Sequence, residues 1–169
     1  FAVDGSQWFA GATVNLSIGQ GELLVTPLQL ANTYATFGNG GRLHQPNVAI
    51  RITDSEGELV REFTPRVLRE LEIPDEYIEP IENGLIGVTL RQGGTATRSF
   101  INANPVFGQW PVAGKTGTAE VKSSTAQKAD TSLFAAYAPV YWPGSRVNPE
   151  VKPEVAIAVV MEESGFGSA

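Results

Sequence analysis

The sequence predicts an α+β fold in which an antiparallel sheet is flanked by helices. Two segments, near residues 26–38 and 79–90, repeat apolar side chains every three or four positions, which is the period of an α-helix. Three apolar, strand-like segments follow near residues 111–122, 132–141 and 154–162. Because short links between successive strands favour an antiparallel meander, we expect these three segments to form one sheet.

The first helix, residues 26–38, has both ends marked in the sequence. Thr26 is a typical N-cap, Pro27 suits the first helical position, and Gln29 completes a capping box. A glycine-rich run that begins at Gly38 predicts where the helix ends. The residues expected to form its buried stripe are Leu28, Leu30, Ala31, Tyr34, Ala35 and Phe37.

A small peripheral hairpin is predicted at residues 47–63. Apolar and polar side chains alternate on both sides of the letters DSEG. That pattern is typical of two antiparallel strands that turn near Asp54 to Gly57. The sequence therefore places a two-stranded element between the two helices.

The second helix is placed by apolar side chains that lie three or four residues apart, such as Ile81, Leu85 and Val88. Proline is tolerated in the first turn of a helix but not in its interior, so Pro80 puts the expected start near residue 79. The helix is expected to end at residue 90, before a glycine-rich turn.

Composition narrows the classes of function. At 169 residues with 42% hydrophobic content and no internal boundary, residues 1–169 are expected to belong to one domain. A net charge of -6 without a basic run argues against nucleic acid or an anionic membrane surface as the main partner. With no cysteine and only one histidine, His44, we expect neither a metal site nor a cofactor. No segment approaches the about 18 consecutive apolar residues of a membrane span.

One strand candidate, PVAGKTGTAEVK, carries a cation, two hydroxyls and a glycine in consecutive positions: Lys115, Thr116, Gly117 and Thr118. Beside a cleft, the lysine supplies a positive charge and the threonines supply short hydrogen-bond donors, while the glycine lets a ligand approach the backbone. Those groups suit a small carboxylate. The backbone N–H of Thr118 would also be able to stabilise the oxyanion of an acyl-transfer intermediate.

Several segments together resemble class B penicillin-binding proteins: NLSIGQGELLVTPLQLANTYATFGNGG, GGTA, VAGKTGTAEV, FAAYAP and VAIAVVMEES. They occur in the order and at about the distances found in that family, and the match spans nearly the whole chain. The resemblance implies the penicillin-binding serine-transpeptidase fold. It also implies the activity of a D,D-transpeptidase, which cross-links peptidoglycan stem peptides through an acyl-serine intermediate. Such an enzyme is acylated by β-lactams. The resemblance further implies work at the extracytoplasmic face of the bacterial cell membrane beside a membrane glycosyltransferase.

The resemblance gives each motif residue a role. Lys115 matches the lysine that joins the hydrogen-bond network of the nucleophile and helps to move its proton. Thr116 and Thr118 match the hydroxyls that hold the terminal carboxylate of the substrate or of a β-lactam. Gly117 matches the glycine that keeps the strand open to the ligand. The amide of Thr118 matches one half of the oxyanion hole.

The same resemblance exposes a gap, because the family pattern includes a Ser-x-x-Lys nucleophile and a Ser-x-Asn motif. No serine of this chain has lysine three positions on or asparagine two positions on. Since nucleophilic catalysis needs the hydroxyl and its base within hydrogen-bond reach, this chain alone is expected to be inactive. We expect it to be the C-terminal portion of a transpeptidase domain, with the nucleophile and a membrane anchor on polypeptide before Phe1 and a closing helix after Ala169. The last strand, apolar on both faces, would otherwise leave an open edge.

Three alternatives remain open. A β-lactam-sensing domain shares the Lys-Thr-Gly strand and is acylated without turnover. A β-lactamase hydrolyses rather than transfers, but such enzymes lack the long GQGELLVTPLQLA lead-in and the extra hairpin of this chain. A structural domain would carry the motif by coincidence, and a Thr118 side chain buried away from any cleft would favour it.

Overall fold

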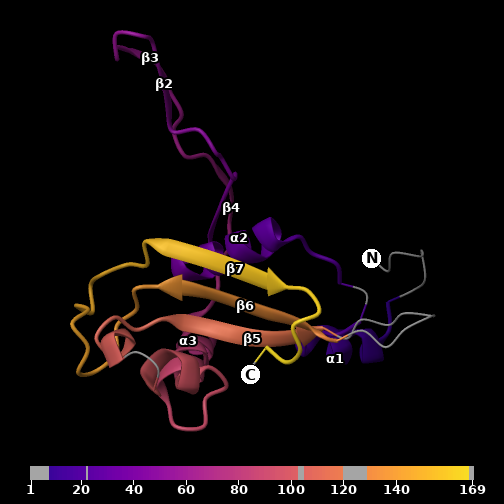
Figure 1. Cartoon of the computed structure of the whole chain (residues 1–169). Helices are drawn as coiled ribbons and strands as arrows, with labels where there is room; N and C mark the ends of the chain where they lie inside the picture. The colour runs from indigo at the N-terminus through magenta and orange to yellow at the C-terminus, as the bar shows by residue number, and fades with distance from the viewer. Residues whose placement is uncertain (1–7, 22, 103–104, 120–128, 168–169) are drawn as a thin grey trace.

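The structure is a computed structural model that describes residues 8–21, 23–102, 105–119 and 129–167. Its centre is a three-stranded sheet of β5 (Ala113–Ala119), β6 (Thr131–Ala138) and β7 (Val155–Met161) in the order β5-β6-β7. Both pairings are antiparallel (Figure 1). The α+β class and the antiparallel meander are therefore confirmed.

The strand bounds differ from the expected ones at several ends. β5 begins two residues after position 111, and the last part of the expected segment 111–122 lies outside the described residues. β6 ends at Ala138 rather than at residue 141, because Pro139 follows and proline has no N–H to donate to a strand ladder. β7 falls within the expected segment 154–162.

Helix α2 (Pro27–Gly38) is fixed by its N-terminal cap. The Thr26 hydroxyl accepts a hydrogen bond from the Gln29 N–H at 3.2 Å, and Oε1 of Gln29 accepts one from the Thr26 N–H at 2.8 Å. This reciprocal pair satisfies two N–H groups that have no partner within the helix. One member of the expected buried stripe was wrong, because Leu28 lies exposed in the first turn.

Helix α3 (Asp75–Leu90) starts four residues before the expected position 79. Pro80 lies inside the helix and not in its first turn, so the expected start was wrong. Asp75 and Glu76 occupy the first turn, where carboxylates interact favourably with the positive end of the helix dipole. Thr89, which is fully buried, donates to the carbonyl of Val112 at 2.6 Å and so ties the helix to the strand that follows.

Both long helices pack on the same face of the sheet, behind it in Figure 1. Tyr137 of β6 joins them, since its ring lies 6.1 Å from that of Phe37 in α2 and its hydroxyl donates to Glu82 in α3 at 3.1 Å. The buried apolar cluster at this junction consists of Ile86, Ala113, Tyr137 and Val140.

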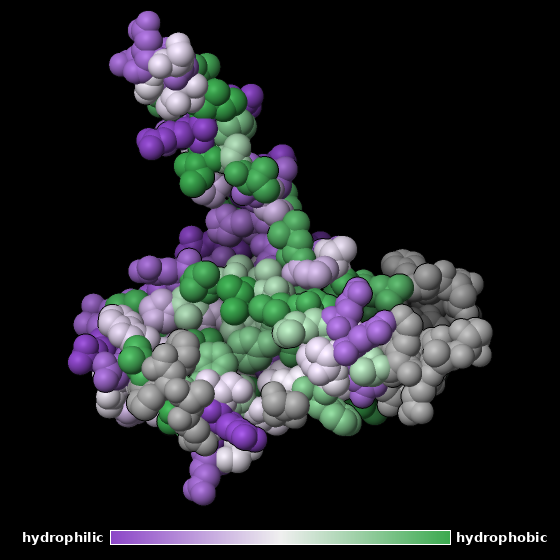
Figure 2. Space-filling model, viewed as in Figure 1, coloured by the Kyte–Doolittle hydropathy of each residue, from purple (hydrophilic) through white to green (hydrophobic). Residues whose placement is uncertain are grey.

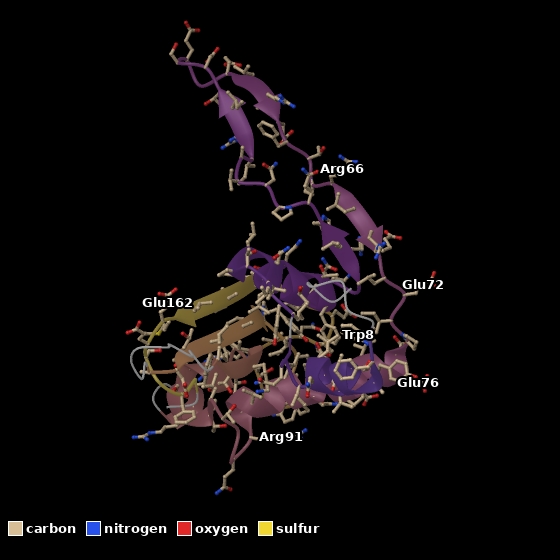
Figure 3. All side chains as sticks on the ribbon, turned by 90° about the vertical axis from the view of Figure 1, so that its right-hand side faces the viewer. Trp8, Arg66, Glu72, Glu76, Arg91 and Glu162 are labelled. Carbon is tan, nitrogen blue, oxygen red and sulfur yellow. The ribbon has the colours of Figure 1, made fainter. Side chains whose placement is uncertain are left out.

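A long two-stranded arm, residues 42–70, stands away from the sheet (Figures 1 and 3). Its base is β1 (Arg42–His44) paired with β4 (Val67–Glu70), and its outer part is β2 (Arg51–Thr53) paired with β3 (Leu59–Glu62). At the tip, the Asp54 carboxylate accepts from two backbone N–H groups. The predicted hairpin at residues 47–63 is confirmed by the antiparallel β2–β3 pair, whereas the β1–β4 pair at the base of the arm was not predicted.

Three short helices complete the described chain: α1 (Ala10–Ser17), the π-helix η1 (Arg98–Asn102) and the 3₁₀-helix η2 (Pro105–Gly108). The sequence pattern did not predict α1, whose glycine and β-branched residues are weak helix formers. No helix of the described residues is long and apolar enough to cross a membrane.

Much apolar surface is exposed. Figure 2 shows hydrophobic side chains along the arm and over the body. In β7, five large apolar residues are exposed, and within the described chain the strand pairs on one side only. The exposed members of β7 are Val155, Ile157, Val159, Val160 and Met161.

Candidate active site

The four motif residues lie on β5, at the edge of the sheet. Successive side chains of a strand point to opposite faces. Lys115 and Gly117 therefore share the face of Ala113, which packs against α3, while Thr116 and Thr118 lie on the other face. Because β5 is an edge strand of the sheet among the described residues, groups from both faces border the same rim.

Lys115 is exposed although its neighbours along the strand are buried. Its Nζ donates to the Thr116 carbonyl at 2.7 Å, and no other hydrogen bond of this side chain is found within the described residues. An ammonium has three donors. Two of them thus remain for groups beyond the strand.

Thr116 is only 8% exposed and contacts a turn that precedes it by about 20 residues. Its Oγ1 lies 2.7 Å from Oγ1 of Thr95, which is exposed in the Gly93–Ala96 turn. A pair of hydroxyls has two protons, and one of them joins the two oxygens. The other proton is free to be donated to a ligand.

Thr118 contacts the C-terminal segment, residues 162–167. Its Oγ1 accepts a hydrogen bond from the Gly167 N–H at 3.1 Å. The same segment is held to the sheet by Gly165, whose N–H donates to the backbone carbonyl of Asp130 and whose carbonyl accepts from the Ser132 hydroxyl. Since Thr118 acts as an acceptor here, its own hydroxyl proton stays available.

The two glycines of this strand have different surroundings. A Cβ on Gly114 would lie 2.6 Å from the ring of Phe134, so this position has no space for a side chain. A Cβ on Gly117 would lie 3.3 Å from Cβ of Leu133, which is a tight but less severe contact. Gly117 therefore packs closely against β6, and its carbonyl is also approached by Gly167 of the C-terminal segment.

Taken together, the rim presents one ammonium and hydroxyl protons from two sites, which suits an anionic ligand such as a carboxylate. Within the described residues, no group of three or more histidines and carboxylates could hold a metal ion.

Comparison with known proteins decides the family. The family model for the penicillin-binding protein transpeptidase domain matches residues 2–166. This chain belongs to the penicillin-binding protein transpeptidase family.

The sequence is similar to the peptidoglycan D,D-transpeptidase MrdA of Acinetobacter baumannii, with 31% identity over 97% of this chain and 23% of the relative. The fold is similar to penicillin-binding protein A of Mycobacterium tuberculosis in a penicillin G acyl-enzyme complex, with a TM-score of 0.64 and 22% identity over 92% of this chain and 30% of that one. It is also similar to Helicobacter pylori PBP2 in complex with MreC, with a TM-score of 0.66 and 24% identity over 98% of this chain and 26% of that one.

The chain spans about a quarter of the length of the curated penicillin-binding relatives that it matches. Sequence reasoning placed the Lys-Thr-Gly-Thr motif on a strand, and β5 carries all four residues. It missed Thr95 and Gly167 as their partners. The glycine-rich turn around Thr95 was the available signal, whereas nothing in the sequence links Gly167 to Thr118.

Proposed function

We propose that this chain is the C-terminal part of the transpeptidase domain of a peptidoglycan D,D-transpeptidase and supplies the Lys-Thr-Gly-Thr strand of its active site. The observation that carries the proposal is β5, one strand that carries the exposed Lys115 ammonium, bonded to the Thr116 carbonyl, and the hydroxyls of Thr116 and Thr118. The family's Ser-x-x-Lys motif is absent from the sequence. The attacking serine is therefore assigned to polypeptide outside these 169 residues.

In this proposal the two threonine hydroxyls donate to the terminal carboxylate of a D-alanyl-D-alanine stem peptide, and the positive charge of Lys115 attracts it. Lys115 also helps to move the proton of the serine. The serine oxygen attacks the penultimate carbonyl, and the Thr118 N–H stabilises the resulting oxyanion. The terminal D-alanine leaves with a proton, and the amine of a second stem peptide then attacks the acyl-serine and releases it.

β-Lactams follow the first half of this path, since their carboxylate takes the same place and ring opening leaves the acyl group on the serine. The M. tuberculosis relative is described as a penicillin G acyl-enzyme, which supports this part of the proposal. By the same family argument, we assign the enzyme to the extracytoplasmic face of the membrane, beside a glycosyltransferase. The H. pylori relative is described in complex with MreC, so an MreC-like protein is a further candidate partner.

The decisive experiment uses the full-length protein that contains this chain. It is labelled with penicillin, digested, and the adduct is located by mass spectrometry. We expect the adduct on a serine of a Ser-x-x-Lys motif that lies outside residues 1–169. An adduct on a hydroxyl within residues 1–169 would overturn the proposal.

A second assay separates the transpeptidase from the β-lactam sensor. The full-length protein is given a donor stem peptide and an acceptor amine, and the cross-linked product is measured. A transpeptidase forms this product, whereas a sensor is acylated by penicillin and forms none. Rapid release of hydrolysed penicillin would instead indicate a β-lactamase.

A further inference from the structure

A second candidate binding site lies between helix α3 and the segment 139–153 that links β6 to β7. It is a half-open cavity of about 520 Å³, within the size range of small-ligand sites. None of the four motif residues on β5 lines it. The cavity is therefore separate from the proposed active site, and the following inference does not rest on the proposed function.

One wall of the cavity is acidic. Glu82 and Asn83 follow Glu79 by three and four residues, which puts them on the same side of α3, and all three line the cavity. Within the described chain no ion pair engages either carboxylate. Glu82 accepts a hydrogen bond from the Tyr137 hydroxyl, which is a neutral donor. The two negative charges thus lack a cationic partner.

The rest of the cavity is apolar and aromatic. Two of its lining residues, Ile86 and Val140, are each 3% exposed and belong to the buried cluster. The wall opposite α3 is formed by residues of the 139–153 segment: Tyr141, Trp142, Pro143, Pro149, Val151 and Pro153. A ligand held here would bury an apolar body while one polar end meets the carboxylates.

Trp142 already contacts one cation. The guanidinium of Arg91 lies 5.4 Å from the centroid of the Trp142 ring, which is within the range of a cation–π interaction. Arg91 does not line the cavity; it caps the C-terminal end of α3, as Figure 3 shows, and Glu79 lies more than three turns away. The acidic wall is consequently left for a different cation.

From this arrangement we propose that the cavity binds a primary ammonium carried on an unbranched aliphatic chain, as in a lysine side chain or a small diamine. The ammonium pairs with Glu79 and Glu82 and donates to the Asn83 amide oxygen. The aliphatic chain lies on Ile86 and Val140, with the ring of Trp142 beside it. An ammonium suits this site better than a guanidinium because its three donors can address three separate acceptors.

The test compares two ligands of the same shape on the full-length protein. N-acetyl-lysinamide and its uncharged counterpart N-acetyl-norleucinamide are titrated by calorimetry, with 1,5-diaminopentane as a third ligand. We expect the lysine derivative to bind at least about tenfold more tightly than the norleucine derivative, the difference expected for one charge-assisted contact. Binding of the lysine derivative assigns a lysine side chain, and binding of the diamine alone assigns a free diamine.

Three variants complete the test. Glu79→Gln and Glu82→Gln are each expected to weaken ammonium binding about tenfold, while penicillin acylation stays unchanged. Glutamine at position 82 retains an oxygen that can accept from Tyr137, so the fold is preserved. Glu76→Gln is the matched control, because Glu76 is exposed on the same helix and projects away from the body in Figure 3.

The proposal is overturned if neither ammonium compound binds, or if the lysine derivative binds but no more tightly than the norleucine derivative. It is also overturned if Glu76→Gln weakens binding as much as the two cavity variants. Each of these results leaves the acylation of the serine unaffected, so failure here is distinct from failure of the proposed function.

Discussion

At the scale of single residues, the Lys115 side chain contributes little to holding the fold together. Its side chain is exposed, and its hydrogen bond goes to the carbonyl of the next residue. A group with so few structural contacts can be removed with little loss of stability. Its effect on chemistry can therefore be measured cleanly.

We predict that Lys115→Ala in the full-length protein slows penicillin acylation by about 100-fold or more, the usual effect of removing a group that moves a proton in the transition state. The measurement is the rate of labelling by fluorescent penicillin, with thermal unfolding as the check on folding. Lys152→Ala, at an exposed lysine in the β6–β7 connection, is the control and should leave the rate unchanged. Equal rates in the Lys115 variant and the wild type would remove this lysine from the mechanism.

Tyr137, unlike Lys115, has a structural role. Burial raises the pKa of the Tyr137 hydroxyl well above 10, and the negative charge of Glu82 and the hydrogen bond to it raise the pKa further. The folded state therefore keeps a proton that the unfolded state loses above about pH 10. Stability is fully present below that pH and falls as the pH rises beyond it.

Replacement by phenylalanine tests this linkage. We predict that the free energy of unfolding of the wild type falls above about pH 10, and that the fall is shallower in Tyr137→Phe. A smaller slope should persist, because burial also raises the pKa of Tyr34. Denaturant titrations at several alkaline pH values measure both slopes, and identical slopes in the two proteins would contradict the assignment.

At the scale of elements, the sequence predicted correctly those helix ends that depend on residues close together in the chain. Thr26, Pro27 and Gln29 are neighbours in sequence, so the start of α2 was predicted to the residue. The start of α3 was predicted four residues too late because it was placed from Pro80 alone, on the rule that proline belongs in the first turn of a helix. The pairing of β1 with β4 joins residues on either side of the outer hairpin, so alternation within one segment could not predict it.

The candidate site likewise has a part that the sequence predicted and a part that it did not. The residues of the Lys-Thr-Gly-Thr motif are consecutive, so their strand could be predicted. Thr95 meets Thr116 from 21 residues away, and Gly167 meets Thr118 from 49 residues away. Those contacts depend on how the turn and the C-terminal segment pack against the sheet. Only the folded chain brings them together.

The β5–β6 contact supplies an element-scale prediction at Gly114. A Cβ there would lie 2.6 Å from Phe134 and 3.0 Å from Ala136, both on β6. We predict that Gly114→Ala destabilises the domain by about 1–3 kcal/mol, the usual effect of overpacking. Denaturant unfolding measures the change.

Gly84→Ala is the matched control within α3. An added Cβ at Gly84 would meet nothing within 4 Å, so the same substitution should stabilise the helix by about 0.5–1 kcal/mol. Opposite signs at the two glycines are the expected result. A destabilisation of similar size at both positions would show that the close approach at Gly114 is not the cause.

At the scale of the whole molecule, the described residues bury few side chains for a sheet carrying two long helices. β7 has an apolar sequence, five exposed large apolar residues and one unpaired edge. An open apolar edge favours aggregation, and natural proteins usually cover it. This supports the proposal that further polypeptide of the same protein completes the sheet.

Hydrogen exchange tests directly whether further polypeptide adds a strand to the outer edge of β7. In β7 the backbone N–H groups that point toward β6 are bonded, whereas those that point to the outer edge have no strand partner among the residues that the structure describes. If the rest of the protein adds a strand there, the outward amides exchange slowly in the full-length protein and rapidly in the isolated 169-residue chain. β6 is paired on both sides and serves as the internal reference, since its amides must stay protected in both samples for the comparison to hold. With β6 protected, equally fast exchange of β7 in both samples would mean that the remainder of the protein leaves this edge open.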